Sequence, residues 1–115
     1  MNSPERILEF DVNKQRMTKR KGCDFSHIIA GTVGYLKAKF YFSPSEWDGC
    51  RKAASFWYKS DEYAVLLDEN DTCTIPEEAL TGEMFVVTLT GRRDGYNILT
   101  NEVKVKQEVR YNGNG

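Results

Sequence analysis

The sequence predicts an all-β protein, an immunoglobulin-like antiparallel β-sandwich of about seven or eight short strands with one helical turn at most. Apolar and polar residues alternate with a period of two through most of the chain, as in strands with one buried face. Turn-forming residues recur about every 8–12 positions, and no segment has the apolar spacing of a longer helix. A small β-barrel is the alternative that this pattern leaves open.

The size and composition of the chain predict one folded domain. It has 115 residues, of which 40% are hydrophobic and 29% charged, which are ordinary values for a globular protein. We expect residues 1–111 to form the domain and residues 112–115 to be a flexible C-terminal tail. No apolar run approaches the roughly 18 residues of a membrane span, and the N-terminus lacks a signal-peptide pattern. These features predict that the protein has no membrane partner.

Alternation places the first expected strand at residues 7–12, where three apolar residues share one side. The basic stretch 13–24 that follows is interpreted as a loop or an exposed hairpin arm. Residues 63–67 carry little polar side-chain surface, so we expect this strand near the centre of a sheet. The remaining strands are expected at residues 31–42, 51–59, 72–75, 83–91, 96–100 and 103–109.

Proline, glycine and acidic residues mark the expected turns. Ser43-Pro44-Ser45 ends the strand at 31–42, because proline lacks the N–H that a sheet ladder needs. Arg92–Gly95 is interpreted as a hairpin turn, since Asp-Gly readily adopts the positive φ of such turns. The helical turn is expected at Glu77–Leu80, where Pro76 precedes two acids that favour the N-terminal end of a helix.

No pattern in the chain indicates a catalytic centre, a cofactor or a metal site. His27 is the only histidine and lies in an apolar run, where we interpret it as structural. The cysteines Cys23, Cys50 and Cys73 are widely spaced and are interpreted as reduced thiols, with a zinc site that includes His27 as the alternative. The acidic stretch 68–71 lacks the spacing of a calcium loop and is interpreted as a solvated turn. We therefore predict a protein that is not an enzyme and binds no cofactor.

Charge is distributed unevenly along the chain. Residues 1–59 contain 11 Lys/Arg and 6 Asp/Glu, whereas residues 60–115 contain 5 and 11. This asymmetry could direct head-to-tail association of identical copies, although mixing of both halves on one folded surface is the favoured interpretation. The basic stretch 14–21 raises the question of single-stranded nucleic acid, but the acidic pI argues against such a partner.

Several short motifs resemble a β-sandwich domain of Firmicutes phage and prophage structural proteins. They are Trp47-Asp48-Gly49 in a turn, Phe56 in the next strand, the segment Ile75–Leu80 (IPEEAL), Gly91 and Thr100-Asn101. The resemblance extends over about residues 28–107. The chain departs from many members of this group in having no collagen-like, coiled-coil or receptor-binding region after the sandwich.

The resemblance implies a non-enzymatic module that mediates protein–protein contacts in a tail, baseplate or fibre. Such a protein is made in the bacterial cytoplasm without a signal peptide and is located in the virion. Its expected partners are other phage structural proteins or further copies of itself. The alternative function is a domain that binds cell-surface glycans through exposed aromatic residues, for which Trp47 and Trp57 are the candidates.

The resemblance also implies structural roles for individual residues. Trp47 is expected to plug one end of the core, and Asp48-Gly49 to form the tight turn beside it. Pro76 and Leu80 are expected to fix the crossover between the two sheets. The full set of structural or interaction candidates is Trp47, Asp48, Gly49, Phe56, Trp57, Pro76 and Leu80.

Overall fold

The structure is a computed structural model that describes residues 5–43 and 46–110. This part of the chain forms nine strands and one short 3-10 helix. The elements are β1 (Arg6–Asn13), β2 (Arg16–Lys19), β3 (Leu36–Phe42), β4 (Arg51–Tyr58), β5 (Asp61–Leu66), β6 (Thr72–Thr74), η1 (Glu77–Leu80), β7 (Met84–Arg93), β8 (Tyr96–Leu99) and β9 (Val103–Lys106). Pro44 and Ser45 of the expected turn, and the expected tail at 112–115, lie outside the described residues.

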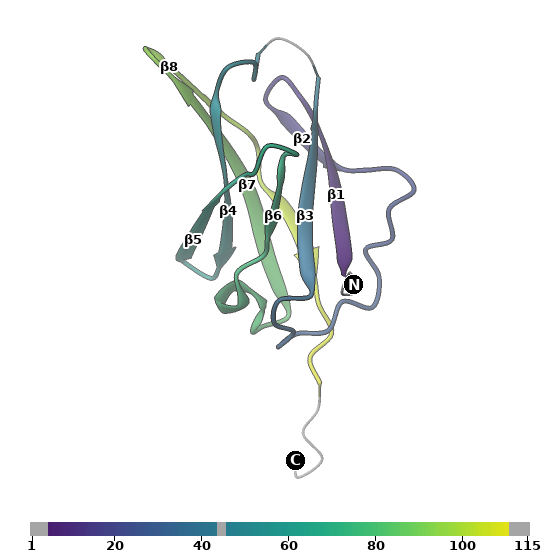
Figure 1. Ribbon diagram of the computed structural model, residues 1–115. Helices are drawn as coiled ribbons and strands as arrows, with labels where there is room; N and C mark the ends of the chain where they lie inside the picture. The colour runs from purple at the N-terminus through teal and green to yellow at the C-terminus, as the bar shows by residue number, and fades with distance from the viewer. Residues whose placement is uncertain (1–4, 44–45, 111–115) are drawn as a thin grey trace.

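The strands form two sheets that pack as a sandwich (Figure 1). The first, called here the β1 sheet, has the order β2-β1-β3-β6; the second, the β4 sheet, has the order β5-β4-β7-β8, and β9 also pairs with β7. The chain crosses between the sheets from β3 to β4, from β5 to β6 and from β6 through η1 to β7. The predicted all-β sandwich is confirmed. From β3 onward the order matches immunoglobulin strands B, C, C′, E, F and G.

One pairing differs from the expected antiparallel arrangement. β1 runs parallel to β3, in register from Arg6 opposite Leu36 to Val12 opposite Phe42. The hairpin of β1 and β2 returns the chain to the end of the sheet at which β1 begins, so a strand that starts there and pairs with β1 runs parallel to it. The sequence does not reveal this direction, because side chains alternate with a period of two in parallel and antiparallel strands alike.

The long connection from β2 to β3 is held by the side chain of Arg6. Its guanidinium donates hydrogen bonds to the carbonyl oxygens of Asp24 (2.9 Å), Ser26 (2.6 Å) and His27 (3.1 Å). A guanidinium offers five N–H donors in one plane, which suits a loop that presents several carbonyl groups. The residue that opens the parallel strand pair therefore also fixes the connection that this pairing requires.

The core lies between the inner faces of the two sheets and follows the predicted alternation. Phe10 of β1 and Phe40 of β3 stack with their ring centroids 5.2 Å apart, and Phe56 of β4 lies 6.3 Å from Phe85 of β7. Burial of one such side chain stabilises the fold by about 1.5–3 kcal/mol relative to leaving it in water. The other largest fully buried side chains are Trp47, Leu8, Met17, Ile28, Ile75, Leu80, Leu89 and Val12.

The expectation of a central strand at residues 63–67 is wrong. β5 pairs only with β4 and forms an edge of the β4 sheet. Its low polarity has a different cause: Ala64 and Leu66 point away from the core and form an uncharged part of the outer face at this edge. A weakly polar strand therefore indicates here an unusual outer surface and not a position buried on both faces.

The two β-hairpins near the ends of the chain differ in detail from the prediction. The basic stretch 13–24 contains β2, so the interpretation as a hairpin arm is confirmed for its first part. The turn expected at Arg92–Gly95 is shorter, because β7 continues to Arg93 and only Asp94-Gly95 separates it from β8. Gly95 has a φ of 68°, the left-handed conformation that favours glycine.

Asn101 joins the two sheets at the edge where β2 lies near β9. Its Oδ1 accepts a hydrogen bond from the Met17 amide (2.6 Å), and its Nδ2 donates to the Met17 carbonyl (3.0 Å). The preceding residue, Thr100, accepts a hydrogen bond from the Leu89 amide through its Oγ1 (3.0 Å). Asn101 thus pairs the backbone of β2 as a neighbouring strand would, which occupies an otherwise open edge.

We expect Asn101→Ala to lower the free energy of unfolding by about 1–3 kcal/mol, because it leaves the N–H and C=O of Met17 unpaired at a part-buried position. Urea denaturation measures this loss. Asn97→Ala is the matched control, since Asn97 is exposed and makes no side-chain hydrogen bond with the described residues; its effect should stay within about 0.5 kcal/mol. Equal effects at positions 97 and 101 would contradict the proposed role of Asn101.

Candidate interaction surface

Trp47 closes one end of the core and is not a surface residue. Its side chain is 1% exposed, its Nε1 donates a hydrogen bond to the Lys14 carbonyl at 2.7 Å, and its ring lies 5.0 Å from that of Phe42. The indole therefore ties the connection between β3 and β4 to the β1–β2 turn. Beside it, Gly49 has a φ of 75°, and the Asp48 carbonyl accepts a hydrogen bond from Arg93 Nη1 at 2.8 Å.

Gly91 of β7 makes room for this indole. A Cβ atom at Gly91 would lie 2.7 Å from Cε3 and 2.8 Å from Cζ3 of Trp47, and 3.0 Å from Cγ2 of Ile98. Carbon atoms do not approach so closely without displacement of one partner. The requirement for glycine at this strand position is therefore steric, and it is set by Trp47.

We expect Gly91→Ala to destabilise the protein by about 1–3 kcal/mol, because the added methyl group overpacks a closed site. The same substitution in a Trp47→Leu background should cost clearly less, since the smaller side chain leaves space for the methyl group. Thermal and urea denaturation of the two single variants and the double variant give the coupling energy between these positions. If the changes in the free energy of unfolding were additive, the need for glycine at position 91 would not be set by Trp47.

Three further candidate residues from the sequence analysis also support the fold and do not form a surface. The side chains of Phe56 and Leu80 are fully buried and take part in the core. Pro76 directly precedes η1, with φ −60° and ψ 135°, and η1 carries the chain from β6 to β7 and so from one sheet to the other. Of the aromatic candidates, Trp57 alone reaches an outer face, where it is half-buried.

The outer face of the β1 sheet is occupied by charged groups that pair with one another. Arg20 lies 2.7 Å from Asp11 and stacks over the ring of Tyr41 at 3.8 Å. The Tyr41 hydroxyl donates to Glu9, and this hydrogen bond raises the pKa of Tyr41 above its usual value. Lys37 pairs with Glu5 at 3.1 Å. The charges of this face are largely satisfied within the molecule, and exposed pairs of this kind contribute little net stability.

The two parts of the described chain differ in charge. Residues 5–43, which form β1, β2 and β3, contain eight Lys/Arg and four Asp/Glu. Residues 46–110, which form the whole β4 sheet together with η1 and with β6 of the β1 sheet, contain eight and thirteen. The two halves compared in the sequence, 1–59 and 60–115, each contribute to both sheets, because β4 lies between β5 and β7 and β6 pairs with β3. This agrees with the favoured interpretation that both halves share one folded surface.

The outer face of the β4 sheet is uncharged at its centre. One row across β5, β4, β7 and β8 consists of Leu66, Ala53, Thr90 and Leu99, and the row below it contains Ala64, Ser55 and Thr88. We call these seven residues, together with Trp57, the β4 face. The side chains of Leu66 and Leu99 are 58% and 51% exposed at its two sides. A neutral centre with exposed aliphatic groups is typical of surfaces that bind another protein.

Polar groups on the β4 face are held in place by local hydrogen bonds. Trp57 Nε1 donates to Thr88 Oγ1 at 3.0 Å, so the indole is tied to the neighbouring strand. Ser55 Oγ donates to Glu62 Oε2 at 2.5 Å. A hollow of about 380 Å³ lies over this region, lined by Arg51, Ala53, Ser55, Glu62, Ala64, Leu66, Thr90 and Arg92. Its floor is thus neutral, and its charged groups are confined to the margin.

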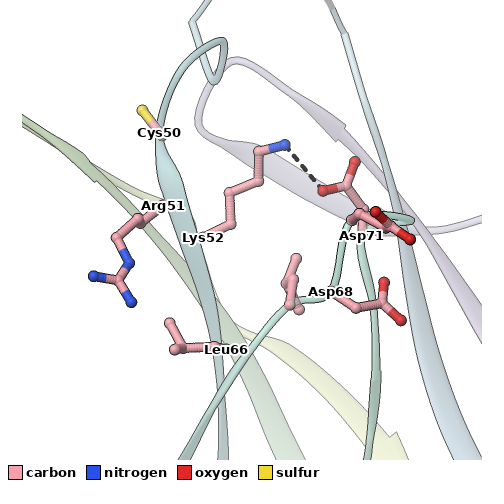
Figure 2. Close-up of a pocket in the computed structure, with 8 residues that line it drawn as sticks. Cys50, Arg51, Lys52, Leu66, Asp68 and Asp71 are labelled. Atoms are coloured by element: carbon pink, nitrogen blue, oxygen red, sulfur yellow. Dashed lines mark hydrogen bonds and ion pairs between the residues drawn. The ribbon is translucent and has the colours of Figure 1, made fainter.

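A second hollow of about 330 Å³ lies beside the N-terminal end of β4 (Figure 2). Lys52 reaches across it to Asp71 at 2.9 Å, whereas Arg51 points to the other side of β4. The Asp68 carboxylate accepts hydrogen bonds from the amides of Asn70 (2.8 Å) and Thr72 (3.0 Å). These acids are therefore engaged in a local turn and an ion pair, which agrees with a solvated turn and not with a calcium loop.

The residues considered for catalysis or metal binding are not brought together. His27 has a side chain that is 83% exposed, and its Nδ1 lies 2.9 Å from Glu108 Oε2. Burial raises the pKa of the Cys73 thiol to about 12, which disfavours its thiolate. Within residues 5–43 and 46–110, no three His, Cys, Asp or Glu side chains are placed to hold a metal ion. The residues of the zinc alternative, Cys23, His27, Cys50 and Cys73, are thus not gathered at one site in the described part of the chain.

Sequence reasoning identified Trp57 but missed the rest of the β4 face. The relevant signal is present at the positions that alternate with the core residues, where Ala53, Ser55 and Ala64 are small and uncharged. Small residues are not conspicuous in a single strand. They become a surface only when the register of β4 with its two neighbours is known.

Neither a protein-family model nor a curated protein matches the chain. In the part of the chain that the structure describes, no helix has the length and apolar character needed to cross a membrane. The function of the β4 face is therefore inferred from its geometry and its chemistry.

Proposed function

We propose that this protein is a non-enzymatic interaction module that docks onto a partner protein through its β4 face. The observation that carries the proposal is the contrast between the two outer faces. Charged side chains of the β1 sheet pair with one another, whereas the central rows of the β4 face have no charged residue and expose Leu66 and Leu99. Depletion of charge at the centre and polar groups at the margin are the usual composition of a protein–protein interface.

The biological setting that we propose is a phage particle, and it is supported by the resemblance of the sequence motifs alone. In that setting the module is part of a tail, baseplate or fibre, its partners are other structural proteins, and it is located in the virion. The immunoglobulin-like order of the strands is compatible with this role, although this fold serves many functions. Both ends of the described chain lie toward the lower end of the sandwich in Figure 1.

We expect Ala64→Arg to abolish docking, because it places a long charged side chain at the neutral centre of the β4 face. The matched control is Thr18→Arg, which places the same side chain on the exposed outer side of an edge strand of the β1 sheet. Both positions are exposed, so each substitution should change stability by less than about 0.5 kcal/mol.

The measurement is affinity purification of the tagged wild type and both variants from the bacterium that encodes the protein, followed by identification of co-purified proteins. The proposal expects phage structural proteins with the wild type and with Thr18→Arg, and their loss with Ala64→Arg. Co-purified proteins that survive Ala64→Arg but not Thr18→Arg would contradict the assignment of the face. Partners unrelated to a phage particle would contradict the setting.

A cell-surface glycan is the second candidate ligand, and the position of Trp57 favours it. The indole is half-buried on the β4 face and lies beside the hydroxyl groups of Thr88 and Ser55. An aromatic ring next to fixed polar groups is suited to orient a small polar ligand. Trp47 takes no part, because it is buried. Glycan-array binding that is lost in Trp57→Ala and kept in Thr18→Arg would support this candidate over a protein partner.

A further inference from the structure

Arg51 and Arg92 form an unusual pair at the margin of the β4 face. They lie directly opposite each other in the antiparallel ladder of β4 and β7, and both are exposed. Side chains at opposite positions of such a ladder have Cβ atoms about 4.5–5.5 Å apart, and like charges there are destabilising. Neither guanidinium makes a hydrogen bond or an ion pair with any residue that the structure describes.

Three other arginines of the molecule are engaged with neighbouring groups, whereas Arg16 and Arg110 are exposed and make no hydrogen bond or ion pair with a described residue. Arg6 donates to three carbonyl groups, and Arg20 pairs with Asp11 and stacks on Tyr41. Arg93, the next residue after Arg92, donates to the Asp48 carbonyl and lies over the Tyr96 ring. The Arg51–Arg92 pair is thus a concentration of positive charge without an internal counter-charge, directly beside the row that carries Leu66 and Leu99.

We propose that this pair receives a carboxylate of the docking partner, and that the partner contributes a segment with an acidic residue next to apolar ones. The proposal rests on the proposed function, which it makes more specific. An Arg guanidinium binds a carboxylate through two parallel hydrogen bonds, and two adjacent guanidinium groups can hold it from both sides. The apolar side chains of the same segment would cover Leu66, Ala53, Thr90 and Leu99.

The distance between the arginine pair and the neighbouring uncharged row defines the kind of partner segment that fits. Arg51 and Ala53 are two residues apart on β4, as are Arg92 and Thr90 on β7, so the charged and apolar rows are separated by about 7 Å. An extended polypeptide places the side chains of residues two apart on one face at this same distance. The partner motif is therefore an extended segment with an apolar residue at one position and Asp or Glu two positions away.

A second copy of this chain does not supply such a group through its own β4 face. Among the outward positions of the β4 sheet, Glu62 is the single carboxylate, and it already accepts a hydrogen bond from Ser55. Lys104 and Lys106 occupy outward positions of β9 at the opposite end of the sheet. Face-to-face pairing of two copies therefore brings no free acid to Arg51 and Arg92, and the occupant in this proposal is a different protein.

The first test, made on the free protein, asks whether Arg51 and Arg92 repel each other. Arg92→Gln relieves the repulsion of Arg51 and should raise the midpoint of thermal unfolding by about 1–4 °C at low ionic strength. The gain should vanish in 1 M salt, where exposed charges are screened within about 3 Å. Lys104→Gln, on the same face but distant from the pair, should not reproduce the gain. A midpoint that Arg92→Gln leaves unchanged or lowers at low salt overturns the premise.

The ligand is tested with an array of extended peptides of alternating apolar residues, each made in two forms that differ only by Glu or Gln at one position. Wild type should bind the Glu forms at least about tenfold more tightly, the scale expected for a charge-assisted hydrogen-bonded pair. Arg51→Gln combined with Arg92→Gln should remove this preference, whereas Lys104→Gln should keep it. Equal binding of both forms, preference that survives the double substitution, or binding of single-stranded oligonucleotides in place of peptides overturns the proposal.

Ala64→Arg separates failure of this proposal from failure of the proposed function. If Glu and Gln forms bind equally and Ala64→Arg abolishes both, the β4 face docks peptides and only the role of the arginines is wrong. If Ala64→Arg binds as wild type does, the β4 face is not the docking surface and both proposals fall. Absence of binding to every peptide overturns the assignment of a carboxylate to the arginine pair. The proposed function is then decided by the affinity purification alone.

Discussion

The structure depends on the packing of two sheets through side chains that occupy every second position. Because Phe10, Phe40, Phe56 and Phe85 and their neighbours fill the interior, the intervening residues are left outside. Their identity is then not constrained by the core, and the two layers use this freedom differently. The β1 sheet pairs many of its outward charges with one another, whereas the central rows of the β4 sheet present small and apolar residues. That difference underlies the functional proposals.

The periodicity of the sequence predicts which residues are buried but not which strands become neighbours. It is sufficient for the sandwich and for the inward positions of β7, whereas the helical turn at Glu77–Leu80 is indicated by Pro76 and the two acids that follow it. It fails for the direction of β1 relative to β3 and for the edge position of β5, because a period of two is the same in every pairing. The tryptophan turn is similar: the burial of Trp47 depends on Gly91, which is distant in sequence.

The candidate surface is hidden from single-sequence reasoning for a related reason. Arg51 and Arg92 are ordinary exposed residues in their own strands, and their adjacency exists only in the register of β4 with β7. The same holds for Asn101, which pairs with the backbone of β2 more than eighty residues away. Interactions between distant strands determine these sites, and sequence motifs indicate them only where a special residue such as glycine is required.

The central claim, that the β4 face is the covered surface in the assembled state, is tested most directly by hydroxyl-radical footprinting of the free protein and of its native assembly. This measurement reports the solvent exposure of individual side chains. The account predicts that Leu66 and Leu99 lose reactivity on assembly, while Tyr35 and Ile7, which are exposed away from the β4 face, keep theirs. Protection of Tyr35 and Ile7 instead, or reactivity of Leu66 and Leu99 that assembly leaves unchanged, would contradict it.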